Sequence, residues 1–563
     1  MMSRFRILSQ ATSEERRRLA RRAATAAGVV VLVAGGLYVA APAAQAASVR
    51  VTRDTSAIRG TAQRVQRVQA NALTPGARLT GPMPARRIPS AMSGDAMRPA
   101  PAAAAAVTAA SLGRVLHNFN GTSSRDSEVT NFNAKFEPPD QALCVGNGFV
   151  LEAVNSAFTI ATNGGTVIRG PFNVNDLFNE GSEEFTSDPR CTYDAPTHTW
   201  FASILFINST STASHMDLAV NSSGDPTGLW TQYQINTNDD GLPGHAGCPC
   251  FGDQPLLGID QTNVYLSTNE FSIVGPEFNG AQIYAVDKSD LVKGHAVARF
   301  VHFDNLTIGG AAAASVQPAI SNGNQPAEYF LSSLDPDGTG GNSLGVWAMT
   351  NRHAVATGGI PTLTSTVIGS QPYTTPPAAI QKGATSLIDS GDDRMQQAQV
   401  INGELWGELG TSVTIAGEAT ARAGAAWFEV HPKLRAGVLA TAAVTRQGYV
   451  VQPHGYVIYP ALQADASGRA AMVFTLTGAN RYPSAAFASL TATGTNFGAP
   501  TVYGAGTGPY DPAATRWGDY SWAVLSPTSD AVWLATEYVP PVSSQTSTRQ
   551  RNWGTRVAEI SLS

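Results

Sequence analysis

Short apolar runs of β-strand length, separated by polar turns, fill the chain from about residue 114 to its end. The clearest stretch contains four such runs, at Cys191–Asp194, Trp200–Phe206, His215–Val220 and Leu229–Ile235. Gly, Pro, Asp and Ser residues separate these runs, a pattern typical of antiparallel strands joined by turns. We find no helical period after the N-terminal region, so the pattern predicts an all-β fold.

A short polar entry containing Asp, Gln or Tyr, mostly beside Pro, precedes an apolar run seven times. The entries are Pro139-Asp140-Gln141, Asp188-Pro189-Arg190, Asp253-Gln254-Pro255, Val316-Gln317-Pro318, Asp393-Arg394-Met395, Tyr459-Pro460-Ala461 and Gly518-Asp519-Tyr520. Starts at 140, 188, 253, 317, 393, 459 and 519 are 48, 65, 64, 76, 66 and 60 residues apart, which suits four-stranded blades with extended loops. The repeat predicts a seven-bladed β-propeller, with six blades and one large insertion as the alternative.

The last repeat is one strand short. It offers Trp522–Leu525, Val532–Glu537 and Arg556–Leu562, and then the sequence ends. The run Arg114–Phe119 belongs to no repeat of its own. We predict that it completes the seventh blade, because closing the ring removes the exposed strand edges that promote aggregation.

The N-terminal region has a different composition from the repeats. Residues 1–46 combine a basic lead, an apolar run at 23–44 and the small-x-small triplet Ala44-Gln45-Ala46, which predicts a cleaved signal peptide. A membrane anchor formed by residues 23–44 is the alternative. Residues 47–111 are rich in Ala, Pro, Arg and Ser, which predicts a disordered tether before a propeller at 112–563.

Composition and charge narrow the classes of partner. The chain is 43% hydrophobic and 14% charged, with a net charge of −5. Residues 1–46 hold seven Arg and two Glu, so cleavage would change the net charge from −5 to −10. This acidity argues against nucleic-acid binding, which needs a basic surface. We expect a secreted or cell-surface protein that meets a membrane only through an uncleaved N-terminal segment.

The four cysteines fit an oxidising compartment and allow three pairings. We favour Cys144 with Cys191, because they follow the entry aspartates of consecutive repeats by four and three residues. Cys248 and Cys250 would then close a small ring or stay reduced. A zinc site is the competing interpretation, but His245 is the only nearby histidine, so we expect no metal there.

Entry loops of propeller blades gather on one face, around the mouth of the central channel. The residues predicted to bind a ligand there are Asp140, Asp188, Arg190, Asp253, Gln254, Gln317, Asp393, Arg394, Tyr459, Trp517, Asp519 and Tyr520. Carboxylates around one opening repel each other unless arginines or a hard cation such as Ca²⁺ compensate them. For each Asp the alternative role is to accept hydrogen bonds that fix a turn. No cofactor is expected beyond that cation.

Several phrases resemble a group of secreted bacterial β-propeller proteins without established activity. The matching phrases are Pro138-Pro139-Asp140, Asp188-Pro189, Asp225-Pro226-Thr227-Gly228, Asn269-Glu270-Phe271, Arg516-Trp517-Gly518-Asp519-Tyr520 and Trp553-Gly554-Thr555. The stretch Ser223–Trp230 is distantly similar to the structural Asp box of sialidase-like propellers, but its Gly228 comes one position late. The resemblance implies the fold and an extracellular location, and it supplies no catalytic residue.

Three functions are compatible with these patterns. We expect binding of an extracellular glycan or protein ligand at the channel mouth, without catalysis. The first alternative is a carbohydrate-active hydrolase or lyase that uses two of the entry carboxylates as acid and base. The second alternative is a purely structural surface protein. The sequence leaves catalysis undecided, because it contains no motif that assembles an active site.

Overall fold

A computed structural model describes residues 58–69, 102–105, 109–131, 136–181, 184–321, 323–335, 338–511, 516–542 and 551–563. Residues 47–563 form one compact unit, and only this unit is described below. The predicted signal segment lies outside the described residues. Within the described part of the chain, no helix is long and apolar enough to cross a membrane.

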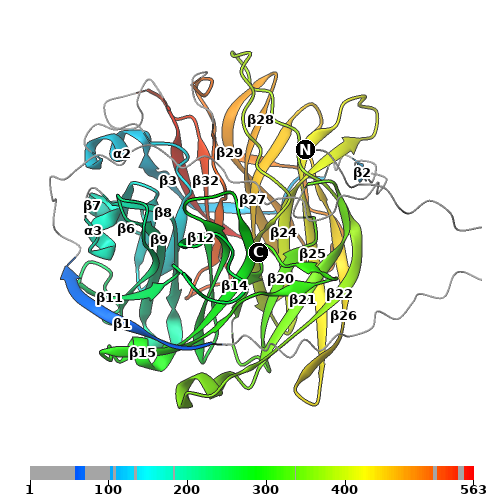
Figure 1. Cartoon of the computed structure of the whole chain (residues 1–563). Coiled ribbons are helices and arrows are strands. Elements are labelled where there is room, and N and C mark those ends of the chain that lie inside the picture. Colours follow the sequence, from blue (N-terminus) through cyan, green and yellow to red (C-terminus); the bar gives the residue numbers. More distant parts are fainter. Residues whose placement is uncertain are drawn as a thin grey trace, which may run out of the picture. The chain divides into compact units, whose positions relative to one another are not determined.

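Consecutive strands pair antiparallel into four-stranded meanders (Figure 1). The first contains β4 (Ala142–Gly146), β5 (Phe149–Val154), β6 (Ala157–Thr162) and β7 (Val167–Asn173). The second contains β8 (Phe185–Asp194), β9 (Thr199–Ile207), β10 (Ser214–Asn221) and β11 (Leu229–Asn236). The third contains β12 (Cys250–Ile259), β13 (Asn263–Ser272), β14 (Phe278–Asp287) and β15 (Val297–Phe303).

The same arrangement continues through the C-terminal half. One meander contains β18 (Gln317–Pro318), β20 (Glu328–Ser333), β21 (Gly341–Thr350) and β22 (Thr362–Tyr373). The next contains β23 (Met395–Ile401), β24 (Glu404–Ile415), β25 (Arg422–Arg435) and β26 (Val438–Val450). It is followed by β27 (Tyr456–Ala464), β28 (Ala470–Gly478), β29 (Arg481–Leu490) and β30 (Thr501–Gly504). Short pairings through β19 (Ile320–Ser321) link β12 to β23.

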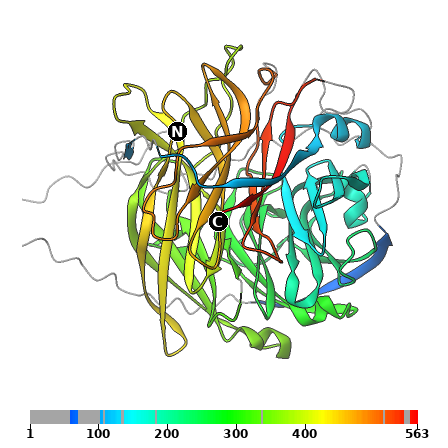
Figure 2. The ribbon, with the colours of Figure 1, turned by 180° about the vertical axis from the view of Figure 1, so that it is seen from behind.

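The last sheet joins the two ends of the propeller. It has the order β3-β33-β32-β31, built from β3 (Arg114–Ser123), β33 (Gly554–Ser561), β32 (Val532–Tyr538) and β31 (Trp522–Leu525). Figure 2 shows the blue β3 against the red C-terminal strands. The predicted pairing of the Arg114 segment with the terminal strand is therefore confirmed.

The first strand of each meander contacts the first strand of the next. These contacts run β4–β8, β8–β12, β12–β18, β18–β23, β23–β27 and β27–β31, and β31 returns to β4. The strands therefore form a closed circle, and the fold is an all-β propeller.

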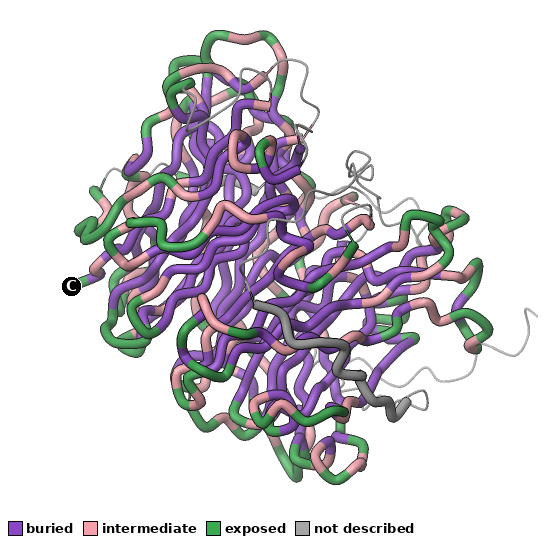
Figure 3. The backbone as a smooth tube through the Cα atoms, turned by 90° about the vertical axis from the view of Figure 1, so that its left-hand side faces the viewer, coloured by how far each residue is buried: buried purple, intermediate pink, exposed green. Residues whose placement is uncertain are grey.

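Apolar side chains fill the space between neighbouring sheets. One cluster joins Leu151 and Phe158 of the first meander to Trp200 and Trp230 of the second, all at most 1% exposed. Figure 3 shows that buried residues follow the strands, whereas exposed residues lie mainly in the loops. The apolar runs of the sequence therefore form the contacts between neighbouring sheets.

The predicted all-β fold is confirmed, and short helices follow some of its strands. Three short helices occur among the described residues: α2 (Ser124–Thr130), α3 (Val174–Phe178) and α4 (Lys288–Val292). Ser123, Asn173 and Asp287 cap their N-termini with side-chain oxygens. Helices of five to seven residues are too short to show a hydrophobic period, so the capping residues were their only signal.

Two pieces of the predicted tether are strands. Residues Ile58–Gln69 form β1, which pairs with β11 and β15, and Ala102–Ala104 form β2, which pairs with β24. Both pieces are extended and pair with strands of the propeller. For the remaining residues of 47–111 the tether stays a prediction.

Candidate functional site

Several predicted entry turns are β-bulges inside the first strands. The pairing register shifts between Ser187 and Arg190 in β8, between Asp253 and Leu256 in β12, and between Ile458 and Ala461 in β27. Each shift contains a Pro, which has no N–H to donate to the neighbouring strand. These three entries therefore redirect side chains within a strand, which corrects the prediction that they are loops before it. Asp140, Asp393 and Asp519 lie outside strands, just before β4, β23 and β31, as predicted.

A left-handed residue marks most of these positions. Asp140, Asp188, Gln254 and Tyr459 have φ values of 51°, 59°, 48° and 52°. The equivalent of Asp188 in the third repeat is thus Gln254 rather than Asp253. Positive φ in residues other than Gly is costly and is concentrated at turns and functional sites.

Three aspartates from distant repeats meet at one point. Asp140, Asp188 and Asp519, called here the carboxylate cluster, each place an oxygen within 4.8 Å of the other two. The backbone N–H of Asp519 donates to Asp140 Oδ1 at 2.6 Å, across 379 residues of sequence. Asn155 Nδ2 donates to Asp140 Oδ2 at 2.7 Å, while its Oδ1 accepts from the N–H of Asp188 at 2.7 Å. Asn155 therefore fixes two of the three aspartates.

Two partly exposed arginines accompany the aspartates. Arg516 pairs with Asp519, and their side chains are 13% and 31% exposed. Arg394 donates through Nε to both carboxylate oxygens of Asp392, at 2.8 and 2.9 Å, and through Nη1 to Gln254 Oε1. The solvent-facing part of the site thus presents both carboxylates and guanidinium groups, which can accept from and donate to a polar ligand.

Arg190 lies deeper, stacked on aromatic rings. Its guanidinium carbon is 3.2 Å from the centre of the Tyr520 ring and 4.8 Å from that of Trp522, and the residue is 1% exposed. Its Nε donates to the carbonyl of Pro255 at 3.1 Å. Tyr520 in turn donates to the carbonyl of Pro189 at 3.0 Å. Arg190 and Tyr520 hold inner strands together, and in this conformation they do not face solvent.

Burial and mutual repulsion shift the titration of these carboxyl groups. Burial and the charges of Asp519 and Asp188 raise the pKa of Asp140 well above its usual range. Burial and Asp519 likewise raise the pKa of Asp188. Burial and Asp188 raise the pKa of Asp253 to about 7. Burial lowers the pKa of Arg516, but the negative charges of Asp519 and Asp140 raise it by more, so the pKa lies above its usual value.

Other predicted residues lie elsewhere. Trp517 is fully buried, donates to Thr475 Oγ1 at 3.1 Å and packs on Tyr510, so it offers no face to a sugar. Burial and Asp335 raise the pKa of Asp393 well above normal, so this carboxyl belongs with Asp335 rather than with the carboxylate cluster. Gln317 donates to the carbonyl of Pro318 and is 1% exposed.

Tyr459 is buried next to Asp389. It is 2% exposed, and burial together with Asp389 and Asp519 raises the pKa of its phenol well above normal. The site therefore reaches towards Tyr459 through Asp389.

The sequence hypothesis omitted several residues of the site: Asn155, Asp389, Asp392, Arg516 and Glu537. Asn155 Oδ1 accepts from the backbone N–H of Asp188, and Asp392 accepts from Arg394 of the entry that directly follows it. Glu537 lies on β32, and burial with Asp140 and Asp519 raises its pKa well above normal. Arg516 and Asp392 each adjoin a predicted entry, which was the one available signal.

The structure contains two disulfide bonds, Cys144–Cys191 and Cys248–Cys250. Cys144 and Cys191 are bonded and join β4 to β8, which confirms the predicted pairing. Cys248 and Cys250 are bonded to each other. The chain thus uses all four of its cysteines in disulfides.

The raised pKa values predict greater stability in mild acid than in mild alkali. Burial raises the pKa of Glu152 from 4.5 to about 7, as it does for Asp253 from 3.8. The folded protein then binds more protons than the unfolded chain between about pH 4 and 7, so the free energy of unfolding falls as the pH rises. Hydrogen bonds that His245 donates to Asp304 and Glu270 raise the pKa of His245 from 6.5 to about 10, which extends this fall to higher pH.

Thermal unfolding followed by fluorescence should show this dependence. We expect the midpoint to fall steadily from about pH 5 to about pH 9. Asp253→Asn should flatten the acid part of the curve, whereas the exposed control Asp530→Asn should not. A midpoint that rises with pH over this range would contradict the assignment of buried protonated carboxyls.

No protein-family model matches the chain, and no curated protein matches its sequence. Among solved structures it is similar to the Hadza microbial sialidase Hz136, at 11% identity over 75% of this chain and 74% of the other, with a TM-score of 0.35. The α-L-arabinofuranosidase Arb93A from Fusarium graminearum is 12% identical over 80% and 98%, with a TM-score of 0.32. A protein of unknown function from Dyadobacter fermentans DSM 18053 is 11% identical over 80% and 100%, with a TM-score of 0.32. Similarities of this size do not extend to chemistry, so the function is argued from the residues of this chain.

Proposed function

We propose that the protein is an extracellular propeller that binds a glycan at the carboxylate cluster and its arginines. The observation that carries this proposal is the convergence of Asp140, Asp188 and Asp519 beside the partly exposed Arg516. Glycan hydroxyls can donate to carboxylates and accept from guanidinium groups, so a mixed set of both suits them. The two disulfides support an oxidising, extracellular compartment.

The proposed architecture behind this site is a seven-bladed ring with the cluster at the mouth of its channel. The circle of first-strand contacts and the pairing of β3 with β33 support that count. In such a ring, the bulges of the first strands lie around the central axis. Residues from β8, β12 and the segment before β31 would then meet although they are far apart in sequence.

Calcium is the cation that the cluster would suit. Asp140, Asp188 and Asp519 offer three carboxylate oxygens, the ligand type that Ca²⁺ takes. A glycan that needs the ion should lose its binding when EDTA is added. If binding is unchanged in EDTA, Arg516 and Arg394 rather than a cation compensate the negative charge of the carboxylates.

A glycan array followed by titration tests the proposal on the full-length protein. Asp519→Ala removes a partly exposed carboxylate, so binding should weaken roughly 10- to 100-fold, the loss expected for a hydrogen bond to a charged group. The matched control is Asp530→Ala, whose side chain is 72% exposed and lies outside the site. Equal binding by both variants would overturn the proposal. A protein that binds no glycan would instead favour a protein ligand or a purely structural role.

A hydrolase or lyase is the second candidate. It is favoured by the environment of Asp253, where burial and the charges of Asp188 and Asp519 raise the pKa of the carboxyl to about 7, since such a group can act as general acid near neutral pH. Polysaccharides bound on the array should then release products, and Asp253→Asn should abolish release while leaving binding intact. Binding without product release would support the first candidate.

A further inference from the structure

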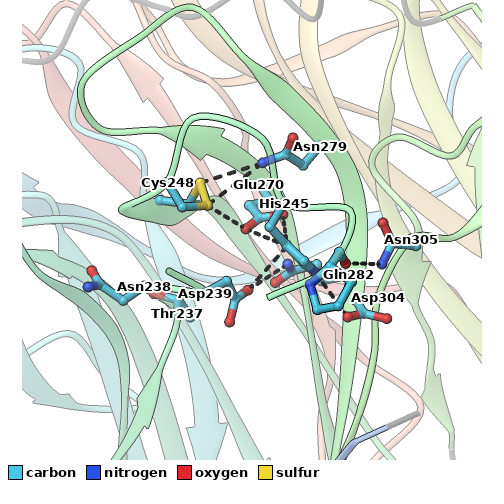
Figure 4. A network of polar contacts seen from close by, with 12 residues as sticks. Thr237, Asn238, Asp239, His245, Cys248, Glu270, Asn279, Gln282, Asp304 and Asn305 are labelled. Atoms are coloured by element: carbon cyan, nitrogen blue, oxygen red, sulfur yellow. Dashed lines mark hydrogen bonds and ion pairs between the residues drawn. A yellow bond between two sulfur atoms is a disulfide. The ribbon is translucent and has the colours of Figure 1, made fainter. Parts of the chain in front are cut away.

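The Cys248–Cys250 disulfide at the start of β12 lies in a separate polar network (Figure 4). Glu270 Oε1 is 3.5 Å from Cys248 Sγ. Asn279 Nδ2 donates towards Cys250 Sγ at 3.5 Å and lies 3.9 Å from Cys248 Sγ. The two sulfurs and a Glu270 oxygen lie within 4.8 Å of one another. A carboxylate and an amide donor therefore flank one S–S bond.

Glu270 is held in place by a buried histidine. His245 Nδ1 is 2.7 Å from Glu270 Oε2, and its Nε2 is 3.0 Å from Asp304 Oδ2. The side chains of His245 and Glu270 are each 1% exposed. Hydrogen bonds that His245 donates to Asp304 and Glu270 raise its pKa to about 10, so the imidazolium stabilises the Glu270 carboxylate. His245 is thus a positioning residue.

The two sulfurs differ in accessibility. Cys248 is half-buried, whereas Cys250 is fully buried. A thiol arriving from solvent therefore reaches Cys248 and leaves Cys250 as the departing sulfur. Asn279 can then stabilise the charge that develops on Cys250.

This disulfide constrains the unfolded chain very little. It spans two positions of sequence, whereas Cys144–Cys191 spans 47. In the chain-entropy account the stabilisation grows with the logarithm of the loop length, so the short link contributes much less. A disulfide that adds little stability and lies beside a carboxylate that can transfer protons is suited to thiol–disulfide exchange.

We propose that Cys248–Cys250 is a thiol–disulfide exchange site that oxidises dithiols. One thiol of the dithiol gives its proton to Glu270, and its sulfur attacks Cys248 Sγ. The Cys248–Cys250 bond breaks, and Cys250 leaves and takes the proton from Glu270, which gives a mixed disulfide on Cys248 and a thiol on Cys250.

The second thiol of the dithiol completes the reaction. It attacks its partner sulfur in the mixed disulfide, Cys248 leaves, and the proton of the attacking thiol passes to Cys248. The dithiol has become a disulfide, and both of its electrons now reside in the two protein thiols. A glutathione disulfide can reoxidise them and yields two glutathione molecules.

The test uses the oxidised full-length protein with dithiothreitol as the dithiol probe. Samples are quenched with iodoacetamide, and alkylated peptides are identified by mass spectrometry. We expect Cys248–Cys250 to be reduced roughly 100-fold faster than Cys144–Cys191, in the folded protein. Glu270→Gln should slow this reduction about tenfold or more and flatten its dependence on pH.

Two further measurements separate chemistry from simple exposure. Glu277→Gln removes a charge from the segment next to Gly247 and should leave the rate within about twofold of the original. With glutathione as a monothiol probe, the mixed disulfide should form on Cys248, with Cys250 alkylated. The proposal is wrong if the glutathione is found on Cys250, if Glu270→Gln reacts as fast as the original at every pH, or if the bond resists reduction until the protein unfolds.

Discussion

Deleting residues 553–563, and with them strand β33, is expected to unfold the whole propeller. This strand lies between β3 and β32, so its loss exposes edges on both sides. Trp553, Val557 and Ile560 are all fully buried, and burial of each contributes about 1.5–3 kcal/mol. Their sum, roughly 5–9 kcal/mol, is comparable to the entire stability of an ordinary domain.

Circular dichroism and gel filtration measure this result. The truncated chain should lose its strand signal and elute as expanded or aggregated material, whereas deletion of the exposed Ser563 alone should change neither. Ile560→Ala supplies a milder variant that should lower the free energy of unfolding by about 2–5 kcal/mol. A truncated protein with the spectrum and elution of the original would show that β33 does not close the fold.

Removing the Cys144–Cys191 disulfide should have the second-largest effect. It joins β4 to β8 across 47 positions, and both cysteines are at most 1% exposed. Loop-closure entropy predicts that the double variant Cys144→Ala/Cys191→Ala loses about 3–4 kcal/mol in the free energy of unfolding. The loss arises because the unfolded chain gains conformations that the bond excludes.

The second disulfide provides the matched control. Cys248→Ala/Cys250→Ala also removes one disulfide, but its loop is so short that the expected loss is less than about 2 kcal/mol. Urea denaturation of both double variants compares the two values directly. Equal losses would indicate that the chain-entropy account does not govern the stability of this protein.

Most of the architecture followed from local patterns in the sequence. The predicted runs of the second repeat agree with β9, β10 and β11 to within one residue at each end, because turn residues bound these apolar runs, whereas β8 begins six residues before the predicted run. The pairing of β3 with β33 followed from counting strands in the last repeat. The Cys144–Cys191 bond followed from equivalent positions in consecutive repeats.

The site was harder to predict, because it depends on where side chains point after a bulge. Asp188 and Gln254 both precede Pro in left-handed conformations, but the sequence suggested Asp253 as the equivalent position. Trp517 adjoins an entry and is nevertheless buried against Tyr510. Asn155, which fixes two aspartates, follows β5 and carries no repeat signal.

A double-mutant cycle between Asp140 and Asp519 tests most directly whether distant repeats converge on one site. Urea denaturation of Asp140→Asn, Asp519→Asn and the double variant gives the coupling free energy, with Asp140→Asn and Asp530→Asn as the control pair. Since the two carboxylates lie within 4.8 Å, we predict a coupling of at least about 1 kcal/mol, and near-zero coupling for the control. Effects of Asp140→Asn and Asp519→Asn that add to within about 0.3–0.5 kcal/mol would contradict it.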